Sequence, residues 1–94
     1  MATMDTIAVK IIKEQELVIG PLAWSEAGKV TGLRVVNRTS AQIEIVDNDQ
    51  KQVINRLVAR YERLFGRASH EVCREAAASI IATLPQAEVP TSLR

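Results

Sequence analysis

Apolar residues recur at helical spacing in the first part of the chain. Over residues 5–19, DTIAVKIIKEQELVI, most apolar positions fall on one broad helical face, whereas Lys10, Lys13 and Glu14 fall on the other. The apolar face consists of Ile7, Ala8, Ile11, Ile12, Val18, Ile19 and Leu22. We expect a helix, because KEQEL is made of good helix formers. A strand stays open as the alternative, since apolar and polar residues also alternate at the start of this range.

The pair Gly20-Pro21 interrupts the helical pattern. Proline inside a helix removes a hydrogen bond and clashes with the preceding turn, but it is well tolerated in the first turn of a new helix. Beyond residue 24 the apolar phase is lost, because Glu26 would fall on the buried face. We therefore expect the N-terminal helix to be kinked or broken at Gly20-Pro21, with Gly28 near the end of the helical region.

Between residues 32 and 46 the period changes from helical to alternating. In GLRVVNRTSAQIEIV, apolar and polar residues alternate on both sides of the polar cluster Asn37-Arg38-Thr39-Ser40. This pattern predicts a β-hairpin over about residues 32–46, with one face packed on helices and the other in water. A two-stranded hairpin is marginal alone, so it must pack on the helices, and its edge can also pair with a second copy.

Two further helices are predicted after the hairpin, over about residues 48–65 and 70–84. Asp47 is the expected N-cap of the first helix, and Gly66 stands where a left-handed terminator belongs. Ser69 is the expected cap of the second helix. The apolar face of that helix consists of Val72, Cys73, Ala76, Ala77, Ile80, Ile81 and Leu84.

This order of elements predicts an α+β fold. The chain has 94 residues, which is enough for one domain, and we expect that domain to span residues 1–94. The end segments, residues 1–4 and 86–94, are expected to be flexible tails, since the latter is polar and contains proline. A core of this size is modest, and oligomerisation is a common supplement, so we expect a homodimer.

Composition narrows the functional classes. Hydrophobic residues make up 47% and charged residues 24% of the chain, which is ordinary for a globular domain. The net charge of +1 argues against strong general affinity for nucleic acid. No apolar run of about 18 residues is found, so we expect no membrane span. Charged residues interrupt the apolar residues of the opening segment, which does not fit a secretory leader, and we expect a cytoplasmic location.

Positive charge is concentrated in the stretch NRLVARYERLFGR. It carries Arg56, Arg60, Arg63 and Arg67, which lie within about 60° of one another on a helix and flank its apolar face. One interpretation is a solvated helix face or pairing within the chain, because cations suit a helix C-terminus. However, like charges on one ridge repel, and arginine suits bidentate contacts with carboxylate or phosphate. An acidic partner protein and nucleic acid therefore stay open as ligands.

Other candidate chemistry is sparse. His70 and Cys73 share a helix face as a thiol and an imidazole would, but Cys73 falls in the apolar stripe and is expected to be a core residue, with His70 at the surface. One histidine and one cysteine cannot close a tetrahedral metal site, and the glycines do not form a phosphate loop. We therefore expect neither a metal nor a cofactor. Trp24 is expected either to cover the helix break as core or to serve as an exposed anchor for a partner.

These patterns favour a small non-enzymatic regulatory or adaptor domain that binds another protein. The predicted contact residues are Arg56, Arg60, Arg63, Arg67 and Trp24. The partner would present an acidic surface, and apolar residues of the N-terminal helix would form the dimer contact. The alternative is a weak nucleic-acid-binding regulator that uses the same arginines for phosphate contacts. An enzyme would have to depend on Cys73.

Overall fold

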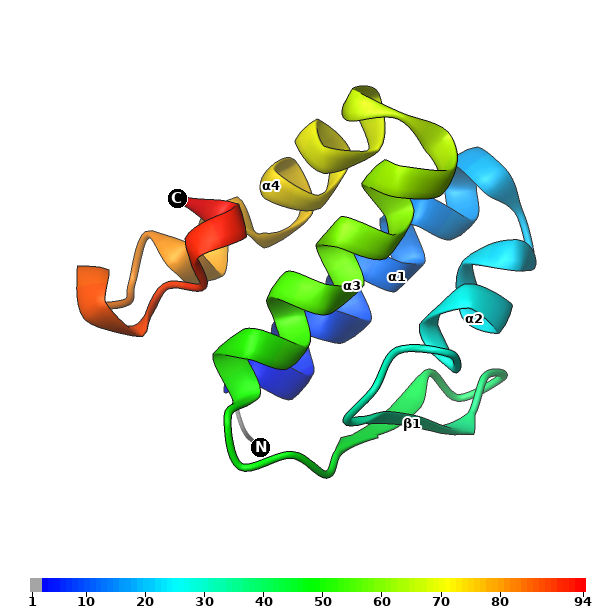
Figure 1. Ribbon diagram of the computed structural model, residues 1–94, viewed down its shortest axis with the longest axis horizontal. Helices are drawn as coiled ribbons and strands as arrows, with labels where there is room; N and C mark the ends of the chain where they lie inside the picture. The colour runs from blue at the N-terminus through cyan, green and yellow to red at the C-terminus, as the bar shows by residue number, and fades with distance from the viewer. Residues whose placement is uncertain (1–2) are drawn as a thin grey trace.

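Helices and hairpin follow one another in the order that the sequence predicts. The computed structural model describes residues 3–94 (Figure 1). Its elements are α1 (Thr3–Ile19), α2 (Leu22–Ala27), β1 (Leu33–Asn37), β2 (Gln42–Ile45), α3 (Gln50–Phe65), α4 (Arg67–Ile81) and the 3-10 helices η1 (Gln86–Glu88) and η2 (Thr91–Leu93). The α+β class, the hairpin and the two C-terminal helices are confirmed.

The helices α1 and α3 each bury five apolar residues and together form most of the helical core. α4 packs on α1 and α3 from one side, whereas α2 and the hairpin pack from the other side (Figure 1). α1 and α4 run in opposite directions, since Gln15 near the end of α1 donates to the carbonyl of Ser69 near the start of α4, at 2.9 Å. The residues that α3 buries are Val53, Ile54, Leu57, Val58 and Tyr61. They recur at helical spacing, so one face of α3 is fully removed from water.

The predicted break at Gly20-Pro21 is confirmed, and α1 is a helix rather than a strand. Gly20 has φ 71° and donates its backbone N–H to the carbonyl of Glu16 at 2.9 Å, which ends α1. Pro21 then caps the short helix α2. The buried face of α1 ends at Gln15, so Val18, which was predicted to lie on that face, is instead 65% exposed.

The starts of α3 and α4 differ from the predicted ones. Asp49, not Asp47, is the N-cap of α3, because its carboxylate accepts from the backbone N–H of Gln52 at 3.2 Å. Gly66, with φ 92°, ends α3 and also precedes the first residue of α4. α4 therefore begins at Arg67, and Ser69, the predicted cap, is buried inside the helix.

The hairpin has the predicted strands and an irregular antiparallel register. Leu33 pairs with Ile45 and Val35 with Ile43, and the register shifts between Val35 and Asn37. The apolar side packs against the helical core. On the outer side Arg34 donates to Glu44 at 3.1 Å, as cross-strand neighbours of opposite charge do.

The segment of residues 86–94, which was expected to be a flexible tail, packs against the helices instead. Its buried residues are Val89, Pro90 and Leu93. Ser92 donates from its backbone N–H and its hydroxyl to Asn55 Oδ1 of α3, at 3.0 and 2.6 Å. This segment docks in spite of its polar composition, because three of its apolar residues are buried against the helices. At the other end, the expected flexible segment of residues 1–4 falls partly on residues 1–2, which lie outside the described residues, while Met4 is buried in α1.

Gly32 is expected to be the glycine whose replacement destabilises the fold most. Its φ is 90°, and a Cβ atom there would lie 2.8 Å from Asp47 Cβ and 2.9 Å from Val53 Cγ2. Gly66 has nearly the same φ of 92° but no atom within 4 Å of that position. Gly32→Ala should therefore lower the free energy of unfolding by about 2–4 kcal/mol and Gly66→Ala by about 1–2 kcal/mol. Urea denaturation of both variants measures the difference, and equal losses would contradict the packing at Gly32.

Candidate functional site

Three of the predicted arginines line a cleft together with the segment that connects α2 to β1. The cleft has a volume of about 270 Å³. The residues that line it are Lys29, Val30, Thr31, Arg56, Ala59, Arg60 and Arg63. Lys29 adds a fourth cation that the sequence pattern did not reveal, because it lies far from the arginines along the chain and outside any helix.

Arg60 is held by a carboxylate at the edge of this cleft. Its Nε and Nη2 atoms both lie 2.8 Å from Glu26 Oε1. The side chains are 25% and 12% exposed, so this pair is more shielded than an ordinary surface pair. The hydrogen bond from Arg60 lowers the pKa of Glu26, with burial acting against it and Lys29 contributing less. Arg60 thus fastens α3 to α2.

Arg56 is likewise engaged within the chain. Its Nη1 atom donates to the carbonyl of Thr31 at 3.1 Å and to Asp47 Oδ2 at 3.2 Å. These acceptors lie just before β1 and just after β2, so one guanidinium joins both ends of the hairpin to α3. The backbone N–H of Asp49 and then Arg56 lower the pKa of Asp47. Pairing within the chain, one of the interpretations that the sequence left open, therefore holds for Arg56 and Arg60.

The other two arginines make neither a hydrogen bond nor an ion pair with any residue of the described range 3–94. Arg63 is exposed and lines the cleft. Arg67 is exposed as well, but it belongs to α4 and lies beyond Gly66. The predicted stripe is consequently divided: Arg56, Arg60 and Arg63 share one cleft, and Arg67 lies outside it.

Trp24 lies in the core. Its side chain is 3% exposed, within a short helix whose other buried residues are Ala23 and Ala27. Trp24 is therefore a core residue at the helix break and not an exposed anchor. Trp24 is accordingly removed from the set of contact residues.

The thiol and the imidazole do not form a pair. Cys73 is buried and accepts a weak hydrogen bond from Gln15 Nε2 at 3.4 Å. Burial raises the pKa of its thiol to about 11, which leaves little reactive thiolate at neutral pH. His70, expected at the surface, is half-buried and bonds instead to Glu62 and to the carbonyl of Ser92.

The basic cleft gathers four cations around one open volume. Within residues 3–94, histidine, cysteine and acidic side chains do not gather in threes as a metal site would require. No helix of that part of the chain is long and apolar enough to cross a bilayer. No family model, curated protein or solved structure matches the chain.

The charge balance of the cleft favours an anionic ligand. Four cations, from Lys29, Arg56, Arg60 and Arg63, stand against the carboxylates of Glu26 and Asp47. Two positive charges are left over. Arg63 keeps all its N–H donors, and Lys29 makes one bond, to Glu26 at 3.3 Å, so these two side chains can turn toward a carboxylate.

Replacing the paired and the unpaired arginine should separate structural from binding roles. Arg60→Met is expected to lower the melting temperature at neutral pH, because the shielded carboxylate of Glu26 keeps only the longer bond to Lys29, whereas Arg63→Met should leave it nearly unchanged. The pKa of Glu26 is lowered by folding, so the contribution of the pair is present above about pH 4.5 and is lost as the pH falls through the folded pKa. The two variants should therefore converge in acid. Melting curves by circular dichroism test this, and equal losses at neutral pH would show that Arg60 is not a structural tie.

Proposed function

We propose that this chain is a small non-enzymatic regulatory or adaptor module that binds an acidic segment of another protein in the basic cleft. The observation that carries the proposal is the excess of two positive charges around one open volume, with Arg63 unpaired within residues 3–94. Complementary charge of this kind sets partner choice and association rate. The proposed contact set is Lys29 and Arg63, together with Arg56 and Arg60, which are already engaged within the chain.

The size and the lining of the cleft suit one or two side chains of a peptide segment as the ligand. Its volume of about 270 Å³ lies just below the range of roughly 300–1,000 Å³ that is usual for small-molecule pockets. Val30 and Ala59 add apolar surface to its lining. A glutamate or aspartate beside an apolar residue would satisfy both features at once, with the carboxylate between Lys29 and Arg63.

Nucleic acid is the second candidate ligand, because the same cations can contact phosphates. Two features make it less favoured than an acidic protein. Glu26 and Asp47 are interspersed among the cations and would repel a phosphate backbone. The net charge of the chain is only +1, which is far from the strongly basic balance of most nucleic-acid-binding domains.

A homodimer in the cytoplasm remains part of this proposal. The apolar residues of α1 that were expected to form the dimer contact, such as Ile7 and Ile11, are used inside the fold. Only Leu17 and Val18, at the end of α1, leave large apolar side chains in solvent there, 79% and 65% exposed. Sedimentation of the chain with and without Leu17→Ser tests the dimer separately from the cleft.

A library of random peptides provides the direct test of the ligand class. Peptides selected on the immobilised protein are expected to be enriched in glutamate or aspartate next to an apolar residue. Their affinity should fall roughly tenfold or more in the double variant Lys29→Glu, Arg63→Glu, since like charges would then face each other. Fluorescence anisotropy of a labelled selected peptide measures this, with short single-stranded DNA as competitor.

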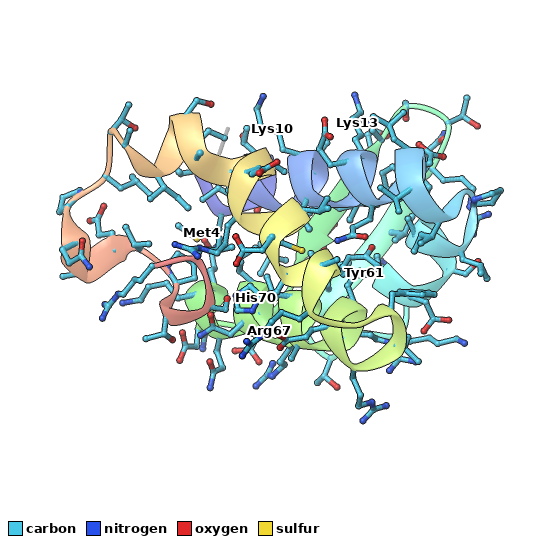
Figure 2. All side chains as sticks on the ribbon, turned by 90° about the horizontal axis from the view of Figure 1, so that it is seen from above. Met4, Lys10, Lys13, Tyr61, Arg67 and His70 are labelled. Carbon is cyan, nitrogen blue, oxygen red and sulfur yellow. The ribbon has the colours of Figure 1, made fainter. Side chains whose placement is uncertain are left out.

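The matched control changes the same charges on another face. Lys10 and Lys13 extend from α1 on the side away from α3 (Figure 2). The double variant Lys10→Glu, Lys13→Glu should keep full affinity, although its net charge is identical. Equal losses in both double variants, or selected peptides without acidic residues, would overturn the proposal. Displacement of the peptide by DNA at low salt, lost steeply as salt rises, would favour the nucleic-acid alternative.

A further inference from the structure

The segment of residues 86–94 is a strap that covers α3 and α4. After α4 the chain turns and comes back beside that helix (Figure 1). Val89 and Leu93 of the strap are buried against the helices. Leu93 also lines a cleft of about 470 Å³ together with Ala78 and Ile81 of α4. Removing the strap would therefore widen this cleft and expose apolar surface of the bundle.

Most polar bonds of the strap to α3 involve groups that do not titrate near neutral pH. Asn55 accepts from Ser92 and donates to Thr91 Oγ1 at 3.0 Å. Lys51 Nζ donates to the carbonyl of Ala87 at 2.8 Å. The bonds of Asn55 persist from weakly acidic to weakly basic solution, because amide and hydroxyl groups carry no proton that ionises there.

His70 makes the one bond to the strap that depends on an imidazole proton. Its Nε2 atom lies 2.5 Å from the carbonyl oxygen of Ser92, and its Nδ1 atom lies 3.1 Å from Glu62 Oε2 (His70 is labelled in Figure 2). A carbonyl and an ionised carboxylate only accept hydrogen bonds. A neutral imidazole has a single N–H, so both bonds are made only when both ring nitrogens carry a proton.

The surroundings of His70 favour this doubly protonated form. Glu62 faces it from α3, and Glu71 adds a negative charge from α4. On the strap, the guanidinium of Arg94 donates to the carbonyls of Val89 and Gln86 rather than to the groups around His70. The bond to Ser92, and then Glu62, raise the pKa of His70, with burial opposing.

We propose that His70 is a proton-operated latch, which holds residues 86–94 on α3 and α4 while both ring nitrogens are protonated and loosens them when one proton leaves. Because folding raises the pKa of His70, both bonds are complete below about pH 6.5, and one of them is lost as the pH rises through the folded pKa. The Glu62 carboxylate is a stronger acceptor than a carbonyl, so the remaining proton stays on Nδ1 and the bond from Nε2 to Ser92 is the one that is lost. The strap is therefore held less tightly toward alkaline solution, while its other bonds remain. This inference does not depend on the basic cleft.

Nuclear magnetic resonance can follow the latch and the strap in one sample. His70 is the only histidine of the chain, so its ring nitrogens give unambiguous signals. Between about pH 6 and pH 9 we expect one ring nitrogen to lose its proton. Protection of the Ser92 and Leu93 amides, relative to intrinsic exchange rates, should fall roughly tenfold with the same midpoint, as expected for the loss of one charged hydrogen bond.

Three variants separate the latch from ordinary packing. His70→Gln should remove the pH dependence of strap protection, and Glu62→Gln should move the midpoint to lower pH. Asn55→Ala should weaken protection equally at every pH, because its bonds do not titrate. A wild-type ring with one proton at pH 6, pH-independent protection of Ser92, or unchanged pH dependence in His70→Gln would overturn the proposal.

Discussion

Burial of one face of α3 is the constraint on which the rest of the structure depends. That face is completely removed from water, and its largest member, Tyr61, donates its hydroxyl to the carbonyl of Ala23 at 2.6 Å. Burial raises the pKa of this phenol far above its usual value, so it stays a donor at all ordinary pH. Once this face is fixed against α1, α2 and α4, the rotation of α3 about its own axis is set. Every polar residue on its two edges then has a defined direction.

Polar residues on the two edges of α3 bind two parts of the chain that bury few apolar residues themselves: the hairpin with α2 on one edge, and the strap on the other. One edge carries Arg56 and Arg60, which bind the hairpin ends and α2. The other edge carries Asn55 and Glu62, which reach the strap directly and through His70. Small domains bury limited apolar surface, so such polar ties help to hold segments that hydrophobic packing alone would leave loose. Among residues 3–94 Arg63 has no such partner, and the binding role that we propose for the cleft rests on this difference.

Local patterns were sufficient to predict the elements but not their connections. The periods of residues 5–19 and 32–46 indicated the first helix and the hairpin, because burial of one face imposes a period on any element. The choice of Asp47 as the cap of α3 was wrong, since two aspartates stand nearly side by side and only the fold shows which of them Arg56 engages. Composition also misled at residues 86–94, where a few apolar residues suffice for docking.

The cleft was predictable only in part, because local patterns do not show which distant residues meet in the fold. The spacing of Arg56, Arg60 and Arg63 showed that they share an edge of α3. Their partners and Lys29 come from a distant stretch of the chain, and no local rule links positions so far apart. In the sequence Glu26 stands out only because it interrupts the apolar phase of the first helix, although in the fold it is the group that fixes Arg60.

The central claim is that neighbouring arginines on one edge of α3 have different roles, with Arg60 structural and Arg63 free to bind. A nuclear magnetic resonance titration with a selected acidic peptide tests it most directly, because arginine Nε–Hε signals and backbone amides are seen together. The account predicts that the Arg63 signal and the amides of Lys29, Val30 and Thr31 shift, while the Arg60 Nε–Hε signal stays in place on Glu26. Shifts confined to α1 and α4, or an Arg60 signal that moves together with that of Arg63, would contradict it.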